Sequence, residues 1–150
     1  ASTELISASL SAAEALAAER LKIEVGAPVY QLERLRLGDN VPLCLEVTLL
    51  PAALYPGLLG EDLTGSLYEL LHRRYGVLLE RAESRIRAVA PTARQAEILR
   101  VDASQPCIAI RATTMSEAHP DVVMESSVSL YRGDRYELLV ETEPLNAGRE

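Results

Sequence analysis

The pattern of apolar and polar positions along the chain predicts a series of short strands interrupted by three helices. Strands are expected where the two kinds of side chain alternate, and helices where apolar side chains return every three or four residues. The extended segments are 3–10, 28–37, 41–50, 77–90, 106–116, 121–131 and 135–141. The helical segments are 11–21, 64–75 and 91–99.

Residues at the ends of these segments support the assignment. Ser11 and Glu14 fit a capping box, in which both side chains bond to backbone N–H groups at the start of the first helix. Residues 38–40 (Gly-Asp-Asn) are typical turn residues and predict a hairpin between the strands on either side. Gly76 is expected to end the second helix.

Residues 77–90 alternate in a way that predicts a half-exposed strand. One face carries Arg81, Glu83, Arg85 and Arg87, and the other carries Ala82, Ser84, Ile86 and Ala88.

The two halves of the chain resemble each other at an offset of 78 residues. Residues 19–32 (ERLKIEVGAPVYQL) align with 97–110 (EILRVDASQPCIAI), and Glu46 then falls opposite Glu125. Chance similarity of a common unit is the alternative, but the shared order predicts a duplicated unit of helix, strand and hairpin. We therefore expect an α+β fold with an antiparallel sheet and the helices on one face.

Composition limits the class of fold and of function. With 150 residues, of which 48% are hydrophobic, the chain has the size of one domain with one core. It contains no Trp and no Phe, so aliphatic side chains must fill most of that core. The net charge of −7 argues against nucleic-acid binding by this chain alone, because phosphate backbones are bound by clustered Lys and Arg.

The cysteines and the hydropathy indicate the compartment. Cys44 and Cys107 lie in apolar runs away from both histidines, so neither a disulfide framework nor a metal site is expected. No apolar run has the length of a membrane span, and the first residues do not follow a signal-peptide pattern. We expect a soluble, cytoplasmic chain that does not contact a membrane.

Arg34 and Arg36 are the first candidate binding residues. They lie two apart in a predicted strand, so their side chains leave the same face about 7 Å apart. Such a pair requires a nearby carboxylate, for which Glu46 is the candidate, or a bound anion. The alternative is a strand face solvated by water.

The hairpin register decides which side chains accompany this pair. A register off by one residue would place Leu43 and Leu45 on the arginine face instead. The expected pairs are Leu37 with Val41, Arg34 with Cys44, and Leu32 with Glu46.

Two further segments carry polar side chains suited to a ligand. The second helix begins at Thr64 or Ser66, where free N–H groups can bind an anion, and Tyr68 adds a hydroxyl. Ordinary helix capping explains the same residues. In 121–131, one strand face carries Glu125, Ser127, Ser129 and Tyr131, a stripe that suits a hydroxylated ligand or plain solvent.

Sequence motifs of catalysis are missing. The chain has no HExxH, GxSxG, GxGxxG or Walker-type loop, and its two histidines are far apart. We therefore expect no catalytic residue, no metal site and no cofactor.

Taken in order, four segments of the chain closely resemble one known domain. LERLRLGDNVPLCLE, DLTGSLYELL, RAVAPTA and MESSVSLYRGDRYELL are similar to the effector-binding (UTRA) domain of the HutC branch of GntR-family transcription regulators. The resemblance covers about residues 3–141. It implies a chorismate-lyase-like fold, in which helices flank an antiparallel sheet.

The resemblance also implies a ligand site. In sugar-phosphate-sensing members, the two arginines and the Ser and Tyr of the central helix hold phosphate, and two Glu and a Tyr meet the rest of the ligand. The matching residues here are Arg34, Arg36, Ser66, Tyr68, Glu46, Glu125 and Tyr131. The second half of the chain has Ala112 and Thr114 where the arginines stand, so the fold itself does not require the pair.

The function implied by the resemblance is that of a sensor. Such a domain binds a small anionic effector, first of all a phosphorylated sugar, and acts in a homodimer. It contacts DNA only through an N-terminal winged helix-turn-helix domain, which is absent from 1–150. The alternatives are a chorismate-lyase-type enzyme acting on a small carboxylate, and an interaction module whose strand edges pair.

Overall fold

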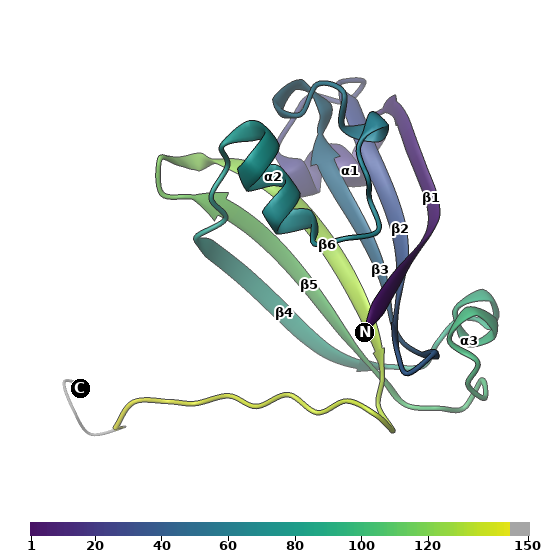
Figure 1. The fold of residues 1–150 in the computed structure, drawn as a ribbon. Helices are drawn as coiled ribbons and strands as arrows, with labels where there is room; N and C mark the ends of the chain where they lie inside the picture. The colour runs from purple at the N-terminus through teal and green to yellow at the C-terminus, as the bar shows by residue number, and fades with distance from the viewer. Residues whose placement is uncertain (145–150) are drawn as a thin grey trace.

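A computed structural model describes residues 1–144 of the chain as one six-stranded antiparallel sheet with three α-helices (Figure 1). The strands are β1 (Ser2–Ala12), β2 (Pro28–Gly38), β3 (Val41–Pro51), β4 (Arg81–Val89), β5 (Cys107–Ser116) and β6 (His119–Arg132). The helices are α1 (Ala15–Leu21), α2 (Leu67–Tyr75) and α3 (Ala93–Leu99), with short 3-10 turns η1 (Ala52–Leu54) and η2 (Leu58–Gly60).

The order of strands across the sheet is β1-β2-β3-β6-β5-β4. β1, α1, β2 and β3 form one side of this order, and β4, α3, β5 and β6 form the other in the same succession of elements. The α+β class and the antiparallel sheet are thus confirmed. α2 lies between the two sets in the chain.

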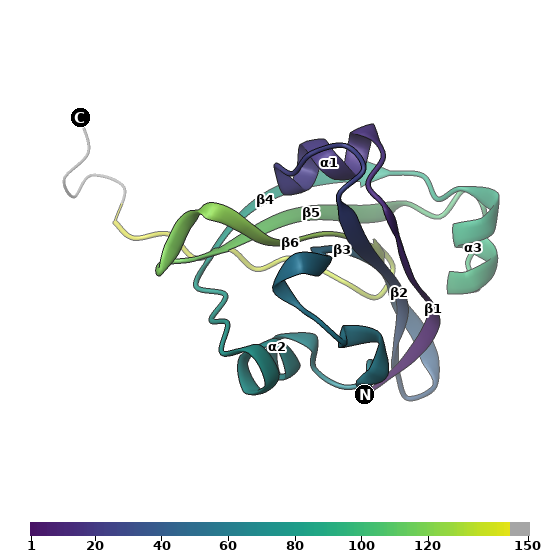
Figure 2. The same cartoon turned by 90° about the horizontal axis from the view of Figure 1, so that it is seen from above.

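The helices cover both faces of the sheet, and the expectation that they share one face is wrong. Figure 2 shows α1 and α2 on opposite sides. The reason is that β2 and β3 are apolar on both faces. Leu32 and Leu50 pack with α2, whereas Val29 and Leu49 pack with α1.

α3 packs on the same side of the sheet as α1. Its Leu99 is buried against Leu35 and Leu45. The face covered by α2 therefore also carries the even-numbered side chains of β2, which include both candidate arginines.

The hairpin between β2 and β3 is confirmed, but its expected register is wrong. Asp39 and Asn40 both have positive φ, which makes a two-residue turn and pairs Gly38 with Val41. A bulge between Arg36 and Leu37 then shifts the register, so that Cys44 and Glu46 lie on the same face of the sheet as the two arginines. The pairs that result are Arg36 with Cys44, Arg34 with Glu46, and Leu32 with Thr48.

The expected capping box of the first helix is also wrong. Ser11 belongs to β1, where it pairs with Val29, and the helix begins only at Ala15. Glu14 occupies the N-cap position without a side-chain cap. The other helix ends agree with expectation, since Ser66 and Gly76 bound α2.

Two expectations for the end strands are wrong. β4 is exposed on both faces along Arg81 to Ala88, because no helix covers this edge of the sheet. Residues 135–141 form no strand, because the chain leaves the sheet after β6 and finds no strand to pair with. It runs away from the body of the fold as an extended segment (Figure 1).

Gly133 provides a test of how β6 ends. Its N–H donates to the carbonyl oxygen of Pro106 at 2.9 Å, and a Cβ at this position would lie 2.5 Å from that oxygen. We expect Gly133→Ala to lower the free energy of unfolding by about 1–3 kcal/mol, because the obstacle is backbone. Urea unfolding measures this. Gly60→Ala is the control, since nothing lies within 4 Å of its Cβ position, and equal stability of the two variants would contradict the prediction.

Candidate functional site

A cavity of about 530 Å³ lies between the sheet and the start of α2. Its walls come from β2, β3, β5 and β6, from the first residues of the chain, and from the loop that leads into α2. All the residues expected to bind a ligand line this one cavity. They are Arg34, Arg36, Glu46, Ser66, Tyr68, Glu125 and Tyr131.

Arg34 is a buried charge that connects three parts of the fold. Its Nη1 donates to the carbonyl oxygens of Leu63 at 3.2 Å and Gly65 at 2.9 Å, and its Nη2 lies 3.3 Å from Glu46 Oε2. The Arg34 side chain is 9% exposed. Its Nε is buried and has no hydrogen-bond partner within residues 1–144. Most of this guanidinium is therefore already used by the protein.

Arg36 differs from Arg34 in its exposure and in its lack of an ion pair within the described part of the chain. It lies two residues along β2 on the same face, it is exposed, and it lines the cavity. None of the ion pairs within residues 1–144 includes it. Its guanidinium is thus free to bind an anion.

The start of α2 faces the cavity with hydroxyls and backbone N–H groups. Ser66 is the N-cap, and its Oγ accepts a hydrogen bond from the Glu69 N–H at 3.3 Å. Tyr68 lies in the first turn and its hydroxyl donates to Glu125 Oε1 at 2.9 Å. The carbonyl groups held by Arg34 come directly before this cap, so the arginine positions the helix.

Glu125 is a buried carboxyl, with only 1% of its surface exposed. Thr114 Oγ1 donates to the same oxygen as Tyr68. Burial raises the pKa of Glu125 above its usual value, and the two hydroxyl donors oppose that shift. The protonated form of this group is therefore favoured more than that of an exposed Glu.

Tyr131 closes the cavity at the far end of β6. Its ring stacks on that of Tyr136 with centroids 3.8 Å apart. Burial raises the pKa of the Tyr131 hydroxyl, which keeps it protonated and able to donate to a ligand.

The cavity also holds polar residues beyond the seven expected ligand contacts. Ser127 and Ser129 belong to the polar stripe recognised in 121–131, and Thr48 follows from the alternation along β3. Thr3 was not recognisable, because its place beside Arg36 depends on the pairing of β1 with β2. Together with the expected residues, the cavity is lined by Thr3, Thr48, Ser127 and Ser129.

Among the charged side chains that line the cavity in residues 1–144, one arginine takes part in no ion pair. Arg34 is paired with Glu46, and Glu125 is disposed to hold its proton. Arg36 remains, beside a helix start and several hydroxyls. This arrangement suits a ligand with an anionic end and a hydroxylated body.

Comparison with known proteins agrees with the fold. Residues 1–137 match the model of the UTRA domain. The chain belongs to the UTRA family. It is an effector-binding domain of the kind found in GntR/HutC-type transcription regulators.

Two similar proteins and one solved structure illustrate the match. The HTH-type transcriptional repressor PhnF of Mycolicibacterium smegmatis is 42% identical over 127 residues, which are 84% of this chain and 50% of that protein. The repressor NagR of Bacillus subtilis is 28% identical over 108 residues, 72% of this chain and 44% of that protein. The effector domain of PhnF from Mycobacterium smegmatis has a TM-score of 0.88 at 36% identity and covers 95% of this chain and 87% of that chain.

These relatives are transcriptional repressors and not enzymes. The expectation of an effector-binding domain of such regulators is thus confirmed, and these relatives give no support to the alternative of a chorismate-lyase-type enzyme. The chain spans about half the length of the curated relatives it matches. Within residues 1–144, no helix has the length and apolar character needed to cross a membrane.

The buried carboxyl predicts a pH dependence of stability. Near pH 4.5, the usual carboxyl value, Glu125 holds its proton in the folded chain and in much of the unfolded ensemble. As the pH rises, the unfolded chain releases this proton first, because the folded-state pKa is raised. The free energy of unfolding should therefore fall relative to that of Glu125→Gln until the pH passes the folded-state pKa.

Urea unfolding of both proteins between about pH 4 and about pH 8 measures this difference. Glu4→Gln removes the same charge from an exposed position on β1 and serves as the control. A difference between the parent and Glu125→Gln that stays constant across the range would show that burial does not disfavour the charge.

Proposed function

We propose that this domain binds a small anionic metabolite in the cavity at the start of α2, and that a phosphorylated sugar is the first candidate. The observation that carries the proposal is Arg36, an exposed guanidinium that lines the cavity and takes part in no ion pair within residues 1–144. Planar guanidinium groups bind phosphate and carboxylate through paired hydrogen bonds.

The geometry of the cavity supports a ligand with two chemically different ends. A phosphate at Arg36 would share the cavity with the start of α2 and with the Ser66 hydroxyl. Beside Arg36 on the same face of the sheet, Glu46, Ser129 and Tyr131 suit sugar hydroxyls. A cavity of about 530 Å³ is of the size used for small metabolites.

For the intact protein, we propose a cytoplasmic homodimer that controls DNA binding through an N-terminal winged helix-turn-helix domain. The names of the similar proteins support this, since both are HTH-type transcriptional repressors. Effector binding alters DNA binding only if the effector prefers one arrangement of the dimer over another.

The two halves of the sheet also support an origin by duplication of one unit, which we propose as the history of the fold. Each half contains a strand, a helix and then a hairpin: β1, α1, β2 and β3 in the first half, and β4, α3, β5 and β6 in the second.

Replacement of Arg36 tests the ligand site. We expect calorimetric titration with sugar phosphates, phosphonates and carboxylates to identify a ligand whose affinity falls about 10- to 100-fold in Arg36→Ala, because charge-assisted hydrogen bonds are lost. Arg36 is the better position for this test than Arg34, whose loss would also release the loop before α2.

Arg73→Ala is the matched control, because it removes an exposed arginine from α2 outside the cavity. It should leave the affinity unchanged. If every ligand that binds the parent binds Arg36→Ala equally well, the site lies elsewhere.

A further inference from the structure

The segment after Tyr136 is extended, and its three adjacent aliphatic side chains, Leu138, Leu139 and Val140, are exposed. Leu139 is 82% exposed and Val140 is 67% exposed. Figures 1 and 2 both show this segment leaving the end of β6 and running away from the sheet. We call residues 137–143 the C-terminal arm. Adjacent exposed aliphatic side chains on extended backbone are typical of a strand that lacks its sheet.

The outer edge of β4 is the matching surface. β4 is an end strand that pairs only with β5, so the backbone groups along its other edge have no strand partner within residues 1–144. Both of its faces are exposed, and Ile86 is 50% exposed. Nothing in the described chain blocks a further strand here.

The side chains of the arm and of β4 are complementary in charge and in alternation. On the arm, Glu137, Leu139, Glu141 and Glu143 share one face, and Leu138, Val140 and Thr142 share the other. β4 presents Arg81, Arg85 and Arg87 with Glu83 on one face, and Ala82, Ser84, Ile86 and Ala88 on the other. An added strand thus sets glutamates beside arginines and aliphatic side chains beside Ile86.

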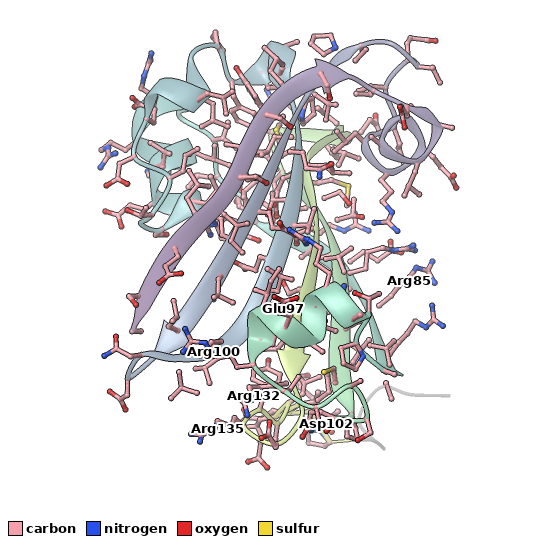
Figure 3. The ribbon with its side chains drawn as sticks, turned by 90° about the vertical axis from the view of Figure 1, so that its right-hand side faces the viewer. Arg85, Glu97, Arg100, Asp102, Arg132 and Arg135 are labelled. Atoms are coloured by element: carbon pink, nitrogen blue, oxygen red, sulfur yellow. The ribbon has the colours of Figure 1, made fainter. Side chains whose placement is uncertain are left out.

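The arginine face of β4 has excess positive charge, and within residues 1–144 the ion pair of Arg85 with Glu83 is the one that includes an arginine of this strand. Figure 3 shows Arg85 projecting away from the sheet. Its side chain is 66% exposed, and Arg111 is its direct neighbour on β5. The one ion pair of Arg85, with Glu83 at 3.6 Å, leaves Arg81 and Arg87 without an acid on this strand. Acidic side chains from elsewhere would relieve this repulsion.

β1, at the other end of the sheet, suits the arm less well. It also has a free edge, but its one charged residue is Glu4, which would repel the arm. The charge pattern therefore selects β4.

We propose that the C-terminal arm of one copy of this chain adds as a strand to the outer edge of β4 of a second copy, and that the exchange is reciprocal. The proposal rests on the proposed homodimer and names the surface that forms it. A two-fold arrangement uses both arms and both edges, which leaves neither β4 edge open to further chains.

The start of the arm lies next to a residue of the effector cavity. Tyr136, the residue before the arm, stacks on Tyr131, which lines the cavity. On the partner side, Ile86 of β4 pairs with Ile110 of β5, another residue of the cavity wall. The arm thus begins beside one cavity and ends beside the wall of the other.

Analytical ultracentrifugation of the 150-residue chain over a range of concentrations tests the proposal. We expect a dimer whose dissociation constant rises at least about tenfold in Val140→Glu and in Ile86→Glu, since each places a charge in the added strand pair. Val25→Glu is the control, because Val25 is 71% exposed and lies away from both surfaces. Thermal unfolding checks that each variant folds.

Charge reversal provides the sharper test. One variant carries Arg85→Glu and Arg87→Glu, and the other carries Glu141→Arg and Glu143→Arg. Each alone places like charges together in both strand pairs and should be monomeric at concentrations where the parent is dimeric. In a mixture of the two, both strand pairs again join opposite charges, so a heterodimer should form.

The outcomes separate this proposal from the proposed effector site. A dimer that Val140→Glu and Ile86→Glu leave intact would show that the subunits meet elsewhere. A parent that is monomeric at about 100 μM would overturn both the exchange and the homodimer. Neither result affects the effector site, which the titration of Arg36→Ala tests by itself.

Discussion

The buried guanidinium of Arg34 is the interaction on which the site depends. A charge in the interior is tolerated only when it is paired and hydrogen-bonded, and Arg34 meets this condition with Glu46 and two carbonyl groups. Its partners come from β3 and from the loop before α2, so one side chain connects the sheet to the helix. Because that loop ends at the N-cap Ser66, the position of Tyr68 over Glu125 also depends on Arg34.

The two arginines of β2 therefore have different tasks, although the sequence presents them as a pair. Arg34 pairs with Glu46 and holds the loop before α2, and its removal would leave a partly buried carboxylate and two carbonyl groups without these donors. Arg36 is exposed and forms no ion pair within residues 1–144. In the proposed site, a ligand anion at Arg36 would not have to displace an existing ion pair, so this arginine would be the more effective contact.

Local patterns were sufficient to predict which residues share a face, and insufficient wherever distant segments decide the geometry. Arg34, Arg36 and Glu46 share the cavity because alternation survives in each strand. Their pairing could not be predicted, since it depends on two left-handed residues in the turn and on a bulge beside Arg36. Ser11 shows the same limit, because its local signal for a helix cap is overridden by pairing of β1 with β2. The buried state of Glu125 likewise depends on β5 and α2.

Tyr131 connects the two proposed properties of the domain. Tyr131 lines the effector cavity, and its ring also stacks on that of Tyr136 at the start of the arm. Stacked rings have few alternative arrangements at this separation, so a ligand that moves Tyr131 also moves the start of the arm. An effector that prefers one position of this ring pair would change the affinity of the dimer. By thermodynamic linkage, dimerisation would change the affinity for the effector by the same factor. The same two rings would then set both the strength and the sign of the coupling.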